Sequence, residues 1–364
     1  MGTPERRPAI LGWVVVLTLG LASVPLFAAL GLPSPAMFAA LFACILNALV
    51  DAGPDLRLPT LGSVIGQGLV GTSMGLLLDT ATMQEVARHW ASISLVTLST
   101  LLLSILVGVL FARLGHLSAP TGVFSLVAGG ASGITAISRE LGADDRVVTV
   151  VQYLRVVLVL VGMPLVTKFV FHPPTGARTA GSDGTHGSLV LNVAFVVLSI
   201  VLGALLARLA HIPAGAMLGP LLVSAVINLT APVGVVEVPK LALQAGYFLI
   251  GLQVGVRFTK ASLRSIQHLL PMAISLIVLV IVGTAGFGQL LAVATHRPSL
   301  DCYLATTPGG IYAVLAVAAD SGADVTFVLS VQVIRLLLML LSAPLIASIL
   351  RRLPPGHPDA EDVD

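Results

Sequence analysis

Residues 33–164 of this chain recur 180 positions later without a net gap. The matched positions are mainly glycines and prolines, joined by an aspartate, a glutamine and an arginine. They include Pro33 and Pro213, Pro59 and Pro239, Gly66 and Gly246, Gly71 and Gly251, Gly75 and Gly255, Gly129 and Gly309, Gly130 and Gly310, Gly142 and Gly322, Asp144 and Asp324, Gln152 and Gln332, Arg155 and Arg335, and Pro164 and Pro344. Glycine and proline fix turns and close backbone contacts, so copies that share them are expected to share one fold. The sequence predicts two homologous repeats.

Composition indicates a membrane protein. Hydrophobic residues make up 56% of the chain, charged residues only 10%, and the mean hydropathy is +1.02. A soluble domain would carry about a quarter charged residues. Several stretches of roughly 20 residues lack Asp, Glu, Lys and Arg, which is the length that a membrane-crossing helix needs. We therefore predict an all-α, multi-pass membrane protein.

Other classes of protein are disfavoured by the same composition. A net charge of +2, without a cluster of basic and aromatic residues, predicts no binding to nucleic acid. Cys44 and Cys302 are too few and too far apart for a disulfide framework or a zinc site, and the eight histidines show no ligand spacing. The sequence predicts no metal, no cofactor and no catalytic residues, and hence no enzyme.

The chain divides at a stretch rich in Pro, Gly, Ser and Thr, residues 172–187, which is typical of a surface linker. We expect a first transmembrane repeat over residues 9–171, a second over 188–352, and a disordered C-terminal tail over 353–364. Each repeat is predicted to hold six apolar segments. In the first they are 9–30, 35–50, 60–78, 90–112, 119–138 and 146–169, and in the second their counterparts begin at 189, 215, 240, 270, 301 and 325.

The fifth segment decides how the repeats are oriented. Glycine doublets near its middle disfavour a continuous helix, so we expect a broken or re-entrant segment and five crossings in each repeat. An odd number of crossings makes the repeats inverted, and the positive-inside rule supports this arrangement. It places 12 basic residues inside and 5 outside, against 10 and 7 for six crossings. The inner 12 are Arg6, Arg7, Arg57, Arg113, Arg139, Arg146, Arg208, Arg257, Lys260, Arg264, Arg351 and Arg352, and the outer 5 are Arg88, Lys168, Arg178, Lys240 and Arg297.

One arginine lies within the sixth segment of each repeat. Arg155 and Arg335 follow Gln152 and Gln332 by three positions, on the same face of a helix. Each arginine lies roughly 12 to 15 Å deep in a hydrocarbon layer of about 30 Å, where a charge costs at least about 3 kcal/mol. Two interpretations stay open: either these residues bind an anionic substrate, or each guanidinium caps unsatisfied carbonyl groups of the neighbouring broken segment.

The broken segment is the second candidate for substrate binding. Small residues allow its backbone to bend and to expose N–H and C=O groups to a ligand, and half-helix ends suit ions and carboxylates. The candidate contacts are Gly129, Gly130, Ser132, Gly309, Gly310 and Tyr312. The alternative is tight helix packing through small residues.

Acidic residues also recur at the offset of 180. Glu140 and Asp320 end the fifth segment and are candidates for coupling to protons or sodium. Asp144 and Asp324 precede the sixth segment and are interpreted as its N-terminal caps.

These motifs resemble those of the bacterial AbrB-type duplicated membrane proteins, whose members carry the labels ammonia monooxygenase or AbrB family transcriptional regulator. The resemblance covers almost the whole chain and is carried by glycine-rich residues from Gly66, a Pro-Gly-Gly run from Pro308, a Gly-Ala-Asp-Val run from Gly322 and a Gln-Val-Ile-Arg-Leu run from Gln332. The first repeat departs from the pattern, with Ala128 in place of the proline. The glycine doublets also resemble the re-entrant hairpins of citrate and glutamate carriers, a fold-level analogy.

The chemistry fits neither family label, since the chain offers no copper or iron ligand set and no soluble DNA-binding module. We expect a secondary transporter in the bacterial inner membrane that moves a small, anionic organic solute by alternating access. The alternative is a membrane sensor that affects gene expression, as the family label implies. The expected partners are the solute, a coupling ion and the lipid bilayer, and a homodimer stays open.

Overall fold

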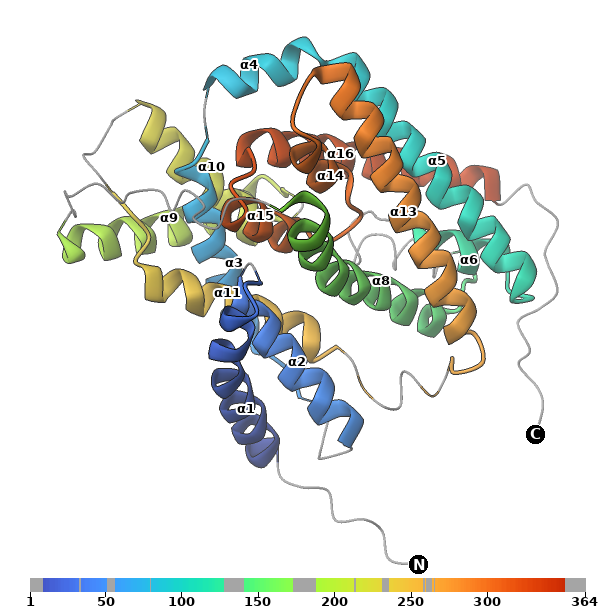
Figure 1. The fold of residues 1–364 in the computed structure, drawn as a ribbon, viewed down its shortest axis with the longest axis horizontal. Coiled ribbons are helices and arrows are strands. Elements are labelled where there is room, and N and C mark those ends of the chain that lie inside the picture. The colour runs from blue at the N-terminus through green and yellow to red at the C-terminus, as the bar shows by residue number, and fades with distance from the viewer. Residues whose placement is uncertain are drawn as a thin grey trace, which may run out of the picture. The chain divides into compact units, whose positions relative to one another are not determined.

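The computed structural model describes residues 9–32, 34–50, 56–78, 80–127, 141–172, 188–212, 214–230, 236–257, 259, 264 and 266–350. These residues form helices joined by turns and loops, and no strand occurs among them (Figure 1). Five helices are long and apolar enough to cross a membrane, namely Ile10–Ala29, Trp90–Leu114, Arg146–Phe171, Leu189–Leu209 and Leu270–Thr295. A bent pair, Thr60–Gly75 with Thr80–Arg88, makes a sixth if it is one span. The prediction of an all-helical chain with several membrane-type helices is confirmed.

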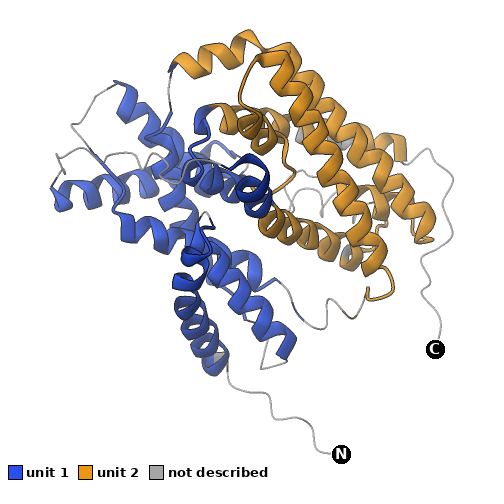
Figure 2. Cartoon of the chain, viewed as in Figure 1, with its two compact units in different colours: residues 1–80, 163–260, 311–326 blue, residues 81–162, 261–310, 327–364 orange. Residues whose placement is uncertain are grey.

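The chain forms two compact units, each of which takes residues from both halves of the sequence (Figure 2). Unit 1 consists of residues 1–80, 163–260 and 311–326. Unit 2 consists of residues 81–162, 261–310 and 327–364. A compact unit is therefore not the same thing as a sequence repeat.

Unit 1 contains seven α-helices and a short π-helix among the described residues. They are α1 (Ala9–Ala29), α2 (Pro35–Val50), α3 (Thr60–Gly75), η1 (Thr167–Phe171), α9 (Leu189–Leu209), α10 (Gly215–Thr230), α11 (Lys240–Gly255) and α15 (Ile311–Asp320). The helix α2 packs against α1 and α11, and α10 packs against α9 and α3. The helix α3 also crosses α11, and α15 packs against both of them. The pairs α2 with α11 and α3 with α10 thus join helices from opposite halves of the chain.

Two glycines allow these helices to approach closely. A side-chain carbon at Gly71 in α3 would collide with the backbone carbonyl of Met217 in α10. A side-chain carbon at Gly251 in α11 would collide with the carbonyl of Met37 in α2. Both positions require glycine because the obstacle is backbone, which cannot turn away as a side chain can.

Unit 2 is built from helices of the second part of each sequence half. They are α4 (Thr80–Arg88), α5 (Trp90–Leu114), α6 (Ala119–Leu126), α8 (Asp145–Val166), α13 (Leu270–Thr295), α14 (Ser299–Thr306) and α16 (Val325–Leu350). The last turn of α8 and the first two residues of α16 belong to unit 1. The short helices α6 and α14 pack against the long helices α5 and α13, which also pack against each other.

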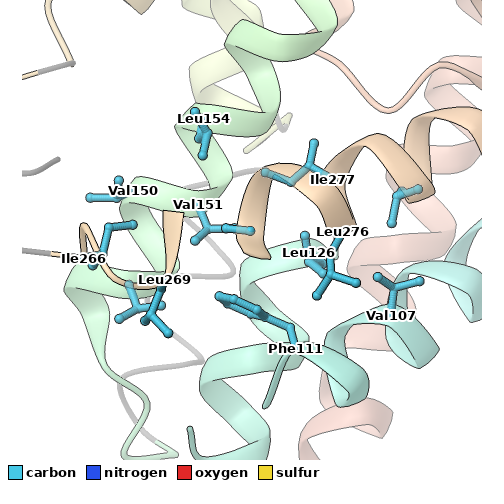
Figure 3. Packing of buried hydrophobic residues seen from close by; sticks show 13 residues of the cluster. Val107, Phe111, Leu126, Val150, Val151, Leu154, Ile266, Leu269, Leu276 and Ile277 are labelled. Carbon is cyan, nitrogen blue, oxygen red and sulfur yellow. The ribbon is translucent and has the colours of Figure 1, made fainter. Parts of the chain in front are cut away.

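A cluster of buried aliphatic side chains surrounds Phe111 and holds the end of α6 in place (Figure 3). Leu126, the last residue of α6, is buried together with Val151 of α8 and Ile277 of α13. Burying an aliphatic side chain of this size contributes roughly 1.5 to 3 kcal/mol. The cluster therefore fixes the C-terminal end of α6 beside α8, where the buried polar side chains lie.

The outer surfaces of the long helices are apolar. Ile10 and Leu21 in α1, and Val190 in α9, expose 76%, 62% and 77% of their surface. Helices that are apolar on all faces are expected where the surroundings are hydrocarbon rather than water. These exposed side chains therefore suit contact with lipid.

The helices begin where the sequence predicts, with small differences. The second half of the chain has helices from residues 189, 215, 240, 270 and 325, as expected, while α14 begins at 299 rather than 301. The predicted segment 60–78 ends earlier, at Gly75, and α4 was not predicted. The expected break in the fifth segment of the second half is confirmed, because the four residues 307–310 separate α14 from α15. The matching region of the first half, residues 128–140, lies outside the described residues.

Candidate functional site

Four polar side chains lie buried on two apolar helices of unit 2. Gln152 and Arg155 belong to α8, and Gln332 and Arg335 belong to α16. None of them exposes more than 6% of its surface. Buried polar groups must find hydrogen-bond partners, so their contacts show which role each one can play.

On α8, the two side chains bind the end of α6. The Gln152 side-chain amide donates to the carbonyl of Phe124 at 2.8 Å. Nη1 of Arg155 donates to the carbonyl of Leu126 at 2.8 Å. The last carbonyl groups of a helix have no partner within that helix, and they carry its negative dipole end. A guanidinium donates a hydrogen bond to such a carbonyl group and also places a positive charge at the negative end of the helix dipole.

On α16, the equivalent side chains bind the end of α14. The Gln332 amide donates to the carbonyl of Leu304 at 2.9 Å and to that of Thr307 at 3.3 Å. Nη1 of Arg335 donates to the carbonyls of Thr306 at 3.2 Å and Thr307 at 2.6 Å. Its Nη2 donates to the Gln332 side-chain oxygen at 2.5 Å. The guanidinium of Arg335 is thus held from two sides.

Two of these contacts recur at the offset of 180 positions. The acceptors Phe124 and Leu304 are separated by that offset, and so are Leu126 and Thr306. Both arginines therefore cap the carbonyl end of a short helix, which is what the structural interpretation of these residues predicts. This contact does not exclude substrate binding, because a guanidinium has five N–H donors.

The two guanidinium groups leave positive charge without compensation. Arg155 and Arg335 are both buried and carry the same charge. Neither forms an ion pair with a carboxylate of the described part of the chain. Nε of Arg155 is also buried without a hydrogen-bond partner. Two buried like charges and an unused donor form a site to which an anion is complementary.

The remaining predicted contacts are only partly brought together. Gly309 and Gly310 follow Thr307 after one intervening proline and are half-exposed, so in the chain they lie close to the carbonyl groups that Arg335 binds. Tyr312 is the second residue of α15 and belongs to unit 1, whereas the two arginines belong to unit 2. Gly129, Gly130, Ser132 and Glu140 lie outside the described residues.

The acidic residues take two different positions. Asp144 accepts hydrogen bonds from the backbone N–H groups of Arg146 at 2.8 Å and Val147 at 3.3 Å, so it caps α8 as the sequence predicts. Asp320 ends α15 in unit 1 and is bonded to Ser34, the residue that precedes α2. Sequence reasoning missed Ser34 because residue 214, its counterpart at the offset of 180, is an alanine.

Comparison with known proteins agrees with these features. The family described as transition state regulatory protein AbrB matches residues 36–351. The chain belongs to the AbrB family. A protein of Escherichia coli (strain K12), provisionally named regulator AbrB, is 30% identical over 342 residues, which cover 93% of this chain and 96% of that protein. A protein of Bacillus subtilis (strain 168), YhjN, which is described as uncharacterized, is 25% identical over 292 residues, covering 77% and 76% of the two chains.

Proposed function

We propose that this AbrB-family protein is a secondary transporter of a small organic anion in the bacterial inner membrane. The observation that carries the proposal is the pair of buried arginines, which carry like charges and have no carboxylate partner among the described residues. Keeping such a pair in apolar helices is costly unless an anion neutralises it. Arginine also suits carboxylates, because two parallel N–H groups can bind both oxygens.

The substrate site in this proposal consists of the glutamine and arginine of each repeat together with the glycine-rich segments. Its residues are Gln152, Arg155, Gln332, Arg335, Gly129, Gly130, Ser132, Gly309, Gly310 and Tyr312. The carbonyl contacts hold each guanidinium in one orientation before the anion arrives. Such preorganisation reduces the entropy lost on binding.

Transport in this proposal proceeds by alternating access of two inverted repeats of five crossings each. The first three helices of each half belong to one compact unit, and the later long helices belong to the other. A division that cuts both halves in the same way supports a mechanism in which one part of each repeat moves against the rest.

A second candidate function is a membrane sensor that regulates gene expression through a partner. The family description and the name of the Escherichia coli relative both refer to regulation, and these words support this candidate. A sensor would bind the same anion without moving it. Neither candidate is an enzyme.

Flux measurements on purified protein in proteoliposomes test the proposal. A panel of labelled mono- and dicarboxylates is offered outside vesicles, and uptake is compared with vesicles that contain the Arg155→Gln, Arg335→Gln double variant. Uptake that depends on the two arginines supports transport. Saturable binding of an anion without flux supports the sensor instead.

A further inference from the structure

A carboxyl group in unit 1 is held by one serine through two hydrogen bonds. Oδ2 of Asp320 accepts a bond from the backbone N–H of Ser34 at 2.6 Å and a second from the Ser34 hydroxyl at 2.8 Å. Ser34 is completely buried and Asp320 is half-buried. A carboxylate removed from water needs donors of this kind.

Ser34 presents these donors from an unusual backbone conformation. Its φ is +51°, in the left-handed region that residues other than glycine rarely adopt. Its carbonyl accepts a bond from Met37 N–H at 2.9 Å, so Ser34 forms the start of α2. Asp320 therefore lies at the positive end of the α2 dipole.

A third polar group completes the cluster. Tyr247 of α11 is completely buried, and its hydroxyl lies beside Ser34, within electrostatic range of the Asp320 carboxyl. That hydroxyl makes no hydrogen bond of good geometry in the described part of the chain. A phenolic oxygen can accept as well as donate, so Tyr247 offers the acceptor that a protonated carboxyl needs for its own O–H. The cluster thus has partners for both protonation states of Asp320.

Other ionisable groups on the helices around Asp320 lie far along their helix axes. Tyr312 lies eight residues before Asp320 on α15, which is about 12 Å. Lys240 is exposed and lies seven residues before Tyr247 on α11, about 10 Å away. Cys44 is ten residues after Ser34, and α3 holds no ionisable residue. On α2, α3, α11 and α15, Tyr247 is therefore the titratable neighbour of Asp320. Beyond these helices, Asp324 lies four residues after Asp320, and Lys168 of η1 donates to the carbonyl of Leu30, four residues before Ser34.

The cluster belongs to one repeat only, which argues against a purely structural role. At the offset of 180, Ala214 replaces Ser34 and Gln67 replaces Tyr247. Ala214 has the same left-handed backbone, with a φ of +54°, and its carbonyl likewise accepts the N–H of Met217. The fold therefore makes this turn without a hydroxyl, and the serine hydroxyl at position 34 is available for another purpose.

We propose that Asp320, Ser34 and Tyr247 form a proton-binding site that couples transport to the proton gradient. The coupling role rests on the proposed transporter function, whereas proton binding itself does not. One carboxyl oxygen of Asp320 takes up a proton. The carboxyl group then gives up a hydrogen bond that it accepted from Ser34 and donates one to the Tyr247 hydroxyl instead, and it loses the proton on the return step. Metal cations prefer a cage of oxygen acceptors, but this carboxylate is met by N–H and O–H donors, which favours a proton over sodium.

Infrared difference spectroscopy on the full-length protein in liposomes tests this site. Spectra recorded over a pH series report the C=O band of protonated carboxyl groups. We expect a titrating band that Asp320→Asn removes and that Glu237→Gln, a change at a half-buried carboxylate elsewhere in unit 1, leaves in place. Ser34→Ala should shift the midpoint of the band by about one pH unit to higher pH, since the hydroxyl donor to the ionised form is lost while the backbone N–H donor remains. Ala214→Ser is the matched control and should leave the midpoint unchanged.

Three results would overturn the proposal. They are a carboxyl band that persists in a folded Asp320→Asn protein, a midpoint unmoved by both Ser34→Ala and Tyr247→Phe, and a midpoint that shifts when sodium replaces choline at constant ionic strength. If Asp320→Asn does not fold, the Ser34→Ala and Tyr247→Phe variants still test the site through the midpoint of the carboxyl band. Absence of anion flux beside an intact Asp320 band would reject the transporter function and leave the proton site standing.

Discussion

Gln332 and Leu304 are joined by a 2.9 Å hydrogen bond from a side-chain amide to a backbone carbonyl, within the apolar interior of unit 2. Leu304 lies two residues before the end of α14, and the next turn supplies the carbonyl groups that Arg335 binds. The glutamine and the arginine therefore hold one short helix end together. Gln152 and Arg155 hold the end of α6 in the same way.

Arg335→Lys should fold but bind anions weakly. Lysine keeps the charge and loses the planar fork that contacts Thr306, Thr307 and Gln332 simultaneously. A lost charged hydrogen bond costs roughly 1.5 to 3 kcal/mol, which corresponds to about tenfold to hundredfold weaker binding. Titration with the transported carboxylate, after size-exclusion chromatography has shown a folded protein, measures the loss. Arg88→Lys, at an exposed position in α4, is the control, and unchanged binding by Arg335→Lys would leave the arginine only its capping role.

Gln332→Leu should destabilise the protein. The substitution preserves approximate volume but leaves the carbonyl of Leu304 and Nη2 of Arg335 without their partner. A buried polar group that loses its partner costs about 1 to 3 kcal/mol, so the apparent melting temperature in detergent should fall by several degrees. Gln84→Leu in α4 makes the same chemical change at an exposed residue and should lie within about 0.5 kcal/mol of the native protein. Equal melting temperatures for the two variants would contradict the proposed importance of this bond.

Two glycines of α13 make a matched pair for testing how α14 is held. A side-chain carbon at Gly288 would lie 2.7 Å from the Thr306 hydroxyl and 3.0 Å from the Cys302 carbonyl, whereas at Gly286 it would meet nothing within 4 Å. We expect Gly288→Ala to displace α14, lower the melting temperature and weaken anion binding at Arg335. Gly286→Ala should instead stabilise the helix by about 0.5 to 1 kcal/mol, because alanine favours helix over glycine. Thermal unfolding of both variants tests this expectation. A lower melting temperature for Gly286→Ala together with an unchanged melting temperature for Gly288→Ala would refute this packing argument.

In the proposed arrangement of inverted repeats, both chain termini lie in the cytoplasm and the linker at residues 172–187 lies outside. A cysteine at Ser182 should then react with a membrane-impermeant maleimide added to intact cells, and a cysteine at Thr3 should react only after the membrane is opened. Cys44 and Cys302 are both buried and can be replaced by alanine to remove background labelling. Labelling of the Ser182→Cys variant exclusively from the cytoplasmic side would show that the topology is wrong.

Sequence reasoning found the helices because their signal is local. Long charge-free stretches and the 180-residue offset locate α1, α9 and α13 at their observed first residues. The helix α4 was not predicted because it is only nine residues long and largely polar. One of its tertiary contacts, the ion pair between Glu85 and Arg297, joins residues 212 positions apart, which no local pattern indicates.

The candidate site was predictable in part for the same reason. A lone arginine in an apolar helix requires a polar partner, and the nearby glycine doublets indicated a broken helix whose carbonyl groups could serve, as Arg335 and Thr307 do. The sequence left open whether that contact or an anion satisfies the guanidinium, because the answer depends on how many N–H groups stay unpaired after folding. The link between Ser34 and Asp320 spans 286 positions and breaks the repeat pattern, so neither periodicity nor duplication indicated it.

The pairing of α2 with α11 and of α3 with α10 bears on how the protein is made. When only the first half has been synthesised, α2 and α3 lack the helices against which they finally pack, because Gly71 has no Met217 carbonyl to meet and Met37 has no Gly251. Unit 1 cannot complete its packing until synthesis has passed residue 320, the end of α15. We therefore expect the helices of unit 1 to pack together largely after they have entered the membrane. A chain truncated at the linker would lack the partners of α2 and α3, and we expect membrane quality-control proteases to degrade it.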